Sequence, residues 1–209
     1  MGMFGGWEAK FSKNFPQKVA SAISGEIKLL GASYDAKAYL GLQPVNGVNH
    51  AVLAEQTLEN GRDTKNAVML IYNEKLDSMD VSLAAIKPIS QSGGPMGGMR
   101  IDVSLDIPEE AKKAFKAAFE GWVGAKVTPV AYLGSQLVNG MNYEMIVEFA
   151  GIGPNQPTDL VIVTVNDLHK SAKFCDLFEK DPSEVSDDNR LNYWIVKGQK
   201  ASLGYAFTW

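Results

Sequence analysis

The sequence predicts an α+β chain of two tandem units, each with one helix packed on a four-stranded antiparallel sheet, and an extra strand region at the C-terminal end. Three observations predict this fold class: a long internal repeat, an Asn-Gly hairpin signal in each copy, and an amphipathic segment ahead of each hairpin. The length of 209 residues fits either one large domain or two small ones, and the repeat favours two.

The internal repeat relates residues 38–55 to residues 131–148, 93 positions further along, and ten of the 18 aligned residues are identical. Gly31-Ala32 and Gly124-Ala125 extend the match, which indicates a tandem duplication. The period is too long for a solenoid and suits small domains. We therefore predict one domain over residues 1–92, a glycine-rich linker over 93–98, and a second domain over 99–209 with a C-terminal extension from about 183.

Each unit is expected to open with a helix. Residues 14–17 (Asn-Phe-Pro-Gln) and 106–109 (Asp-Ile-Pro-Glu) both suggest an N-cap, an early proline and a capping-box residue. Apolar residues follow at helical spacing, and Gly31 and Gly124 are expected to end the two helices. The apolar stripes comprise Val19, Ile23, Ile27 and Leu30, and then Ala111, Phe115, Phe119 and Trp122.

A hairpin follows each helix, with Asn46-Gly47 and Asn139-Gly140 at the turns. A type I′ turn needs positive φ at both central residues, which Asn and Gly tolerate best. The outgoing strands alternate apolar and polar residues, so we expect the helix to cover one sheet face. Two more strands are predicted in each unit, at 67–72 and 81–89 and at 160–165 and 172–178. Residues 181–190 are expected to form a loop, and 191–209 have strand character.

Composition excludes several classes of function. The 20 basic and 24 acidic residues give a net charge of −4, which offers no electrostatic footprint for nucleic acid. No apolar run approaches 18 residues, and the start of the chain does not resemble a secretory signal. A single cysteine excludes an intramolecular disulfide framework and a cysteine-rich zinc site. We expect a cytoplasmic protein that binds neither nucleic acid nor membrane and holds no metal or cofactor.

Candidate catalytic groups are few. His50 lies on an apolar strand face and is expected to be a packed histidine. Cys175 and His169 are six residues apart, a pattern more typical of a buried structural cysteine than of a catalytic dyad. Glu55 and Glu148 repeat, but are expected to lie alone on the outer sheet face. An enzyme is therefore disfavoured.

The repeated hairpin tip is the feature that a purely structural role explains least. Asn-Gly is a good turn, but apolar residues also crowd a tip that should project into water, at residues 43–48 and 136–141. Exposed apolar tips are typical of a partner-binding site.

The motif Gln-x-Val-x-Gly on the first hairpin, after a single helix, resembles the cystatin superfamily. Asn142-Tyr143 is similar to the Thr-Asn-Tyr stretch of that family, and the Gly5-Gly6 start resembles the glycine trunk of its stefin branch. The resemblance covers about residues 4–90 and 97–180. Both units carry the motif, as Gln43, Val45 and Gly47 and as Gln136, Val138 and Gly140.

What the resemblance implies is a reversible inhibitor of papain-like cysteine peptidases, in which a trunk and two hairpin tips fill the active-site cleft. Such a wedge needs no catalytic residue of its own. The second tips would lie near residues 74–79 and 167–171. The implied wedge residues are Gly5, Gly6, Gln43, Val45, Asn46, Gly47, Gln136, Val138, Asn139 and Gly140.

The sequence departs from the family pattern in places. Neither unit has the Pro-Trp pair that secreted cystatins carry on the second hairpin, and Pro44 removes one backbone donor beside the first tip. The second trunk, at Gly97-Gly98, is internal and follows Pro95, so we expect the first unit to be the better inhibitor.

Two alternatives stay open. One is a non-inhibitory binding module that uses the same tips for an unknown partner. The other is a small-molecule-binding domain with a pocket between helix and sheet. Phe119, Trp122 and Tyr143 are candidates to line that pocket, although aromatic residues at such spacings more often belong to a core.

Overall fold

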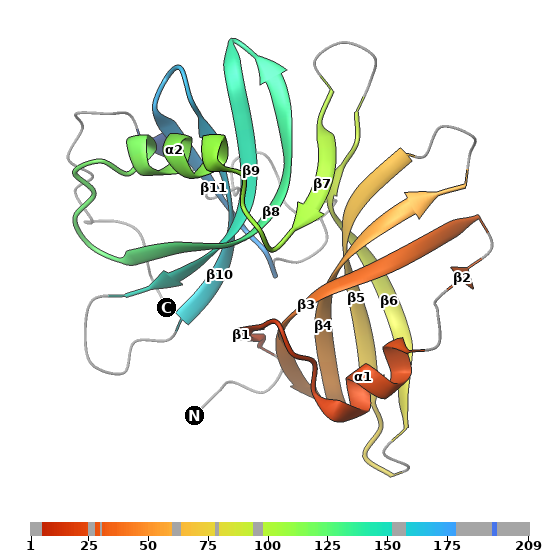
Figure 1. Cartoon of the computed structure of the whole chain (residues 1–209). Helices are drawn as coiled ribbons and strands as arrows, with labels where there is room; N and C mark the ends of the chain where they lie inside the picture. Colours follow the sequence, from red (N-terminus) through yellow and green to blue (C-terminus); the bar gives the residue numbers. More distant parts are fainter. Residues whose placement is uncertain are drawn as a thin grey trace.

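The computed structural model contains two antiparallel sheets, each with a helix on one face (Figure 1). It describes residues 6–24, 28–29, 31–59, 64–77, 80–93, 98–151, 158–178 and 194–195. The prediction of two similar α+β units is confirmed at this level. Among the residues described, no helix is long and apolar enough to cross a membrane.

The first unit consists of one helix and a sheet with strand order β1-β3-β4-β5-β6, with β2 paired to β3 beside this path. Each unit therefore has more strands than the four predicted. The elements are β1 (Glu8–Ser12), α1 (Gln17–Ile23), β2 (Lys28–Leu29), β3 (Ala32–Val45), β4 (Gly47–Leu58), β5 (Thr64–Glu74) and β6 (Val81–Gln91).

The second unit repeats this plan, with strand order β7-β8-β9-β10-β11-β12. The short β12 is all that the structure describes of the predicted C-terminal extension; the predicted loop at 181–190 lies outside the described residues. The elements are β7 (Arg100–Ser104), α2 (Glu109–Ala118), β8 (Lys126–Val138), β9 (Gly140–Ala150), β10 (Thr158–Asn166), β11 (Ser171–Asp176) and β12 (Trp194–Ile195).

The strands β1 and β7, which precede the helices, are missing from the sequence prediction. Both pair with the first long strand of their sheet, and each has a bulge in that pairing. Each strand has only five residues, too short a stretch of alternating residues for the sequence pattern to identify. The predicted helix caps are also wrong, because Pro16 and Pro108 occupy the N-cap positions without a side-chain cap. The backbone N–H of Asn14 instead donates to Ser12 Oγ at 3.0 Å, in a turn that leads into the helix.

Both helices are shorter than predicted. The first ends at Ile23, and β2 occupies residues 28–29, where the apolar stripe predicted more helix. The second ends at Ala118, and Gly121 has φ +80, so the chain leaves helical geometry before Gly124. Ile27 and Leu30 of the first stripe lie outside the described residues.

The hairpins form where the Asn-Gly pairs predict them, but the predicted type I′ turn is wrong. Gly47 and Gly140 have positive φ, whereas Asn46 and Asn139 do not. The strand pairs Val45↔Gly47 and Val138↔Gly140 enclose a single Asn, so one residue of left-handed geometry suffices at each turn.

One face of each sheet packs against its own helix, as predicted. Val19 of α1 is fully buried against residues of β3, β4 and β5, including Val52 and Leu70. In the second unit Phe115 of α2 packs with Met145 and other inward residues of β8 to β11. The apolar alternation along the strands therefore identified the helix-facing side.

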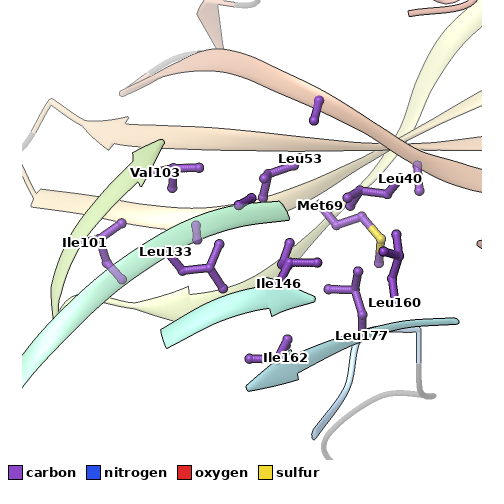
Figure 2. Packing of buried hydrophobic residues seen from close by; sticks show 14 of the residues in the cluster. Leu40, Leu53, Met69, Ile101, Val103, Leu133, Ile146, Leu160, Ile162 and Leu177 are labelled. Carbon is purple, nitrogen blue, oxygen red and sulfur yellow. The ribbon is translucent and has the colours of Figure 1, made fainter. Parts of the chain in front are cut away.

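The opposite faces of the two sheets pack on each other, as Figure 2 shows. Leu40, Leu53 and Met69 of the first sheet meet Leu133 and other apolar side chains of the second. Burying a side chain of this size contributes about 1.5–3 kcal/mol, so this shared core strongly couples the units. The expectation that Glu55 stands alone on an outer face is wrong, because that face is the interface and Glu55 is buried.

The two units are arranged with approximate twofold symmetry. Strand β1 lies against β10, and its counterpart β7 lies against β5. In Figure 1 the β5–β6 turn is therefore at the bottom of the view and the β8–β9 turn at the top. The division into two separate domains stays a prediction.

Candidate partner-binding tips

Each unit places two turns side by side at one end of its sheet. We call the β3–β4 turn (45–47) and the β8–β9 turn (138–140) the main tips, and the β5–β6 turn (75–80) and the β10–β11 turn (167–170) the side tips. In the second unit the N–H of Asp167 donates to the Met141 carbonyl at 3.1 Å, and the N–H of Met141 donates to Asp167 Oδ1 at 2.7 Å. The predicted adjacency of the two turns is therefore present; Ser78 and Met79 lie outside the described residues.

The glycine of each main tip is required by space as well as by conformation. A Cβ on Gly47, which has φ +109, would overlap the backbone carbonyl oxygen of Glu74. A Cβ on Gly140, which has φ +88, would lie 2.7 Å from Asp167 Oδ1 and 2.7 Å from Leu168 Cβ. The repeated glycine thus lets the side tip touch the main tip.

The repeated Gln and Asn residues form a polar ladder below the tips. Asn73 Nδ2 donates to Asn49 Oδ1 at 2.8 Å, and Asn49 Nδ2 donates to Gln43 Oε1 at 2.9 Å. In the second unit Asn166 Nδ2 donates to Asn142 Oδ1 at 2.8 Å. The ladder fixes the main tip relative to the side tip, which explains why the two Asn residues occur in both copies.

Exposed apolar side chains gather at the tips. Among the described residues, five large apolar side chains are exposed, and four of them lie on tips. Leu137 at 66% and Val138 at 44% lie on or beside the second main tip, and Leu168 at 59% lies on the side tip next to it. In the first unit Leu76 is exposed, whereas Val45 is half-buried. Sequence reasoning missed Leu168, although an isolated leucine in a polar turn is a usable signal.

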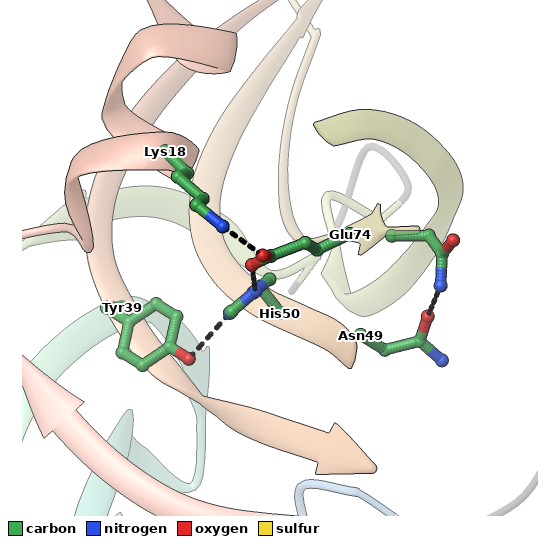
Figure 3. A network of polar contacts seen from close by, with 6 residues as sticks. Lys18, Tyr39, Asn49, His50 and Glu74 are labelled. Carbon is green, nitrogen blue, oxygen red and sulfur yellow. Dashed lines mark hydrogen bonds and ion pairs between the residues drawn. The ribbon is translucent and has the colours of Figure 1, made fainter. Parts of the chain in front are cut away.

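A charged network supports the tips of the first unit (Figure 3). His50 Nδ1 lies 2.9 Å from Tyr39 Oη, and His50 Nε2 lies 3.3 Å from Glu74 Oε2, whose carboxylate also pairs with Lys18 of α1. The hydrogen bond from Lys18 is the main cause that lowers the pKa of Glu74, and His50 adds to it. Burial raises the pKa of Tyr39 to about 12. The histidine is buried, in agreement with the packed role expected for it.

The second unit lacks this network, because Tyr143 occupies the position of His50. Its tip is linked through the side tip instead: Asn139 Nδ2 lies 3.2 Å from His169 Nε2, and the N–H of His169 donates to Asn166 Oδ1 at 2.8 Å. The same motif is therefore held by ionic and aromatic groups in one unit and by amide groups in the other.

The trunk lies at the same end of the sheet as the main tip. Glu8 pairs with Leu42, so the residues before Glu8 run toward Val45. Gly6 is exposed, and Gly5 lies outside the described residues. Trp7 stacks on Phe178 of the second unit, with ring centroids 5.0 Å apart. Beside the second trunk the N–H of Gly93 donates to the Met99 carbonyl at 3.4 Å, and Gly97 lies outside the described residues.

The other sequence candidates are not brought together. Cys175 is exposed rather than buried, because it faces away from the side of β11 on which Phe174 packs. Its thiol lies 3.7 Å from the Asp176 carbonyl oxygen, whereas His169 contacts Asn139 at the tip, so no Cys–His dyad forms. Phe119 and Trp122 pack with Phe174 in the helix-side core instead of lining a pocket.

No family model, curated protein or solved structure matches the chain. The function of this protein is therefore inferred from the geometry of the tips.

Proposed function

We propose that this protein is a reversible inhibitor of papain-like cysteine peptidases and that the paired tips form its binding edge. The observation that carries the proposal is the gathering of exposed apolar side chains at the tips, above all Leu137, Val138 and Leu168. Large apolar side chains at a projecting edge have a low cost of desolvation. They form favourable apolar contacts when they are buried in the cleft of a partner.

The shape of the edge supports occupation of a cleft. Gly47 and Gly140 bring main tip and side tip into contact without intervening side chains, so each edge is narrow. A narrow edge that fills a cleft covers the nucleophile of a peptidase by exclusion. The inhibitor then contributes shape and apolar contact, and the chemistry stays with the target.

The supports below the tips favour tight binding because they restrict motion before the partner arrives. The Asn73–Asn49–Gln43 ladder joins three neighbouring strands in the first unit. Holding side chains in place in advance reduces the ordering cost of association, about 0.5–1.5 kcal/mol for each immobilised side chain.

Titration of papain with the intact chain tests the proposal. We expect stoichiometric inhibition that the double variant Val45→Asp, Val138→Asp weakens at least a hundredfold, because two desolvated apolar contacts become charged. Val123→Asp is the matched control, since Val123 is 77% exposed and lies away from both edges. Full inhibition by the double variant, or none by the intact chain at micromolar concentration, would contradict the proposal.

A non-inhibitory binding module is the second candidate, and one observation favours it for the second unit. There the most apolar edge accompanies an internal trunk, whose flanking residues Gly93 and Met99 are joined by a hydrogen bond. A trunk joined to the chain at both sides suits a partner with a shallow apolar groove better than a deep cleft. No inhibition of papain by the intact chain at micromolar concentration would favour this second candidate.

A further inference from the structure

A cavity of about 400 Å³ lies where β1 of the first unit meets β8, β9 and β10 of the second. Its volume is within the range of small-ligand pockets, roughly 300–1,000 Å³. It lies near residues 126–128 and 148–150, at the end of β8 and β9 opposite to the second main tip. The residues that line it are Ala9, Lys10, Phe11, Lys126, Thr128, Glu148, Ala150, Thr158 and Leu160.

The internal duplication supplies a second copy of this junction, where β7 meets β5. Strand register matches the two copies: Glu55 lies opposite Ala67, and Glu148 lies opposite Leu160. By the same register Lys65 corresponds to Thr158.

At the β7–β5 junction, the position equivalent to the cavity is occupied by the side chains of Glu55 and Lys65. Glu55 Oε2 accepts the backbone N–H of Val103 at 3.0 Å, and Glu55 Oε1 pairs with Lys65 Nζ at 2.8 Å. Glu55 is only 8% exposed. The lysine thus neutralises the buried carboxylate, and the carboxylate satisfies a donor that the bulge in β7 releases from the sheet.

In the copy at β1 the same framework is open. Thr158 stands where Lys65 would close the site, and the carboxylate of Glu148 has no hydrogen bond or ion pair to another described residue. Lys10 replaces Asp102 and Lys126 replaces Ser33, and the ammonium group of neither lysine forms an ion pair among the described residues.

The charge of the junction is reversed as a result. Three acidic side chains (Glu55, Asp102, Asp35) and two basic side chains (Lys65, and Lys37 paired with Asp35) surround the filled copy. One acidic and two basic side chains line the open copy. The filled copy therefore has a net negative charge and the open copy a net positive one, which suits a negatively charged occupant.

We propose that the open junction is a binding site for a small organic anion. The acidic group of the ligand is held by Lys10 and Lys126 at the rim, and its apolar body lies on Phe11 and Ala150, which are partly exposed. Glu148 accepts a hydroxyl or amino donor of the ligand, in the role that Lys65 and the Val103 amide have toward Glu55. This site does not depend on the proposed inhibition by the tips.

Calorimetric titration of the full chain with 4-hydroxybenzoate tests the proposal, with phenyl phosphate as the phosphate arm and benzyl alcohol as the neutral control. We expect one anion per chain and at least tenfold weaker binding of benzyl alcohol. Tighter binding of phenyl phosphate than of 4-hydroxybenzoate would identify a phosphate as the acidic group, and the reverse would identify a carboxylate.

A charge-reversal variant and a matched control test whether the anion binds in this cavity. Lys126→Glu reverses a rim charge and is expected to weaken binding at least tenfold, whereas Lys113→Glu makes the same change on the exposed face of α2 and is expected to change it less than twofold. Thr158→Lys is expected to recreate the Glu–Lys pair, abolish binding and raise the unfolding temperature. The proposal is overturned if neither anion binds at millimolar concentration, or if Lys126→Glu and Lys113→Glu bind alike.

Discussion

The two main tips share a motif but differ in how they are supported and in what they expose. In the first unit a buried histidine links Tyr39 to Glu74, and Lys18 of the helix completes the network. In the second unit amide groups and the backbone of the side tip hold the turn, and the apolar residues Leu137 and Val138 are exposed. Duplication has kept the turn and the ladder while the support and the surface have diverged.

The comparison of the two units shows which repeated residues maintain the structure of the tips. Gly47 and Gly140 both allow the side tip to approach the main tip, and Asn49 and Asn142 both accept a hydrogen bond from the Asn on the neighbouring strand, so geometry accounts for their repetition. Positions that differ between the copies, such as Pro44 and Leu137, lie at the surface of the tips. They are where partner preference can differ between the units.

The largest expected effect separates the two tip glycines. Gly47→Ala should lower the free energy of unfolding by about 2–4 kcal/mol, because its Cβ would overlap a backbone oxygen at positive φ. Gly140→Ala should cost less, about 1–2 kcal/mol, because the atoms it meets belong to side chains that can move. Urea unfolding of both variants measures this difference, and an equal or reversed order would show that the tips are not held as described.

The second effect concerns a buried acid of the second unit. Glu144 is buried between the sheets near Ser90 and Lys173, and burial raises its pKa above the ordinary value of 4.5. The folded state therefore holds this proton more tightly than the unfolded state, so stability falls as pH rises from about 4.5 through the raised pKa. Glu144→Gln should remove that fall and stabilise the protein at neutral pH. An unchanged pH profile of unfolding free energy would contradict this assignment.

The acid of the first tip network should behave in the opposite way. The pKa of Glu74 is lowered, chiefly by the hydrogen bond from Lys18, so its contribution to stability is present above about 4.5 and is lost as pH falls through the lowered value. Glu74→Gln should flatten the acid side of the stability profile. Glu109→Gln serves as a comparison at an exposed Glu–Lys pair on α2, where a smaller change is expected. Equal acid-side changes in both variants would remove the special role of the tip network.

The last prediction tests the ladder. Asn49→Ala removes a side chain that bonds both Gln43 and Asn73, and it should cost about 1–3 kcal/mol of unfolding free energy. Asn142→Ala should cost a similar amount through Asn166. Thermal unfolding of the two variants should give nearly equal shifts; a clear shift in only one unit would show that the ladder matters in that unit alone.

Sequence reasoning identified the duplication, the hairpins and the helix-facing strand sides because these depend on local spacing. It missed β1 and β7 because each alternates polar and apolar residues over only five positions, too few to distinguish a strand from a loop. It also missed the shared core, since residues such as Leu40 and Leu133 look like the reverse side of a solvated sheet until a second sheet covers them.

At the candidate site, the motif correctly placed the two turns of each unit beside one another. It could not predict which apolar residues stay exposed. Val45 and Val138 occupy equivalent positions of the repeated motif, yet the side chain of Val45 is half-buried and that of Val138 is exposed. The residues around the motif, Pro44 in one unit and Leu137 in the other, differ and are not part of it, so the motif alone cannot predict that difference.

Papain inhibition by the single variants Val45→Asp and Val138→Asp, each compared with Val123→Asp, tests the central claim most directly. We predict that each tip variant loses part of the inhibition while Val123→Asp retains all of it, because each edge binds through its own main tip. Undiminished inhibition by both single variants would contradict the claim that the tips are the binding surface.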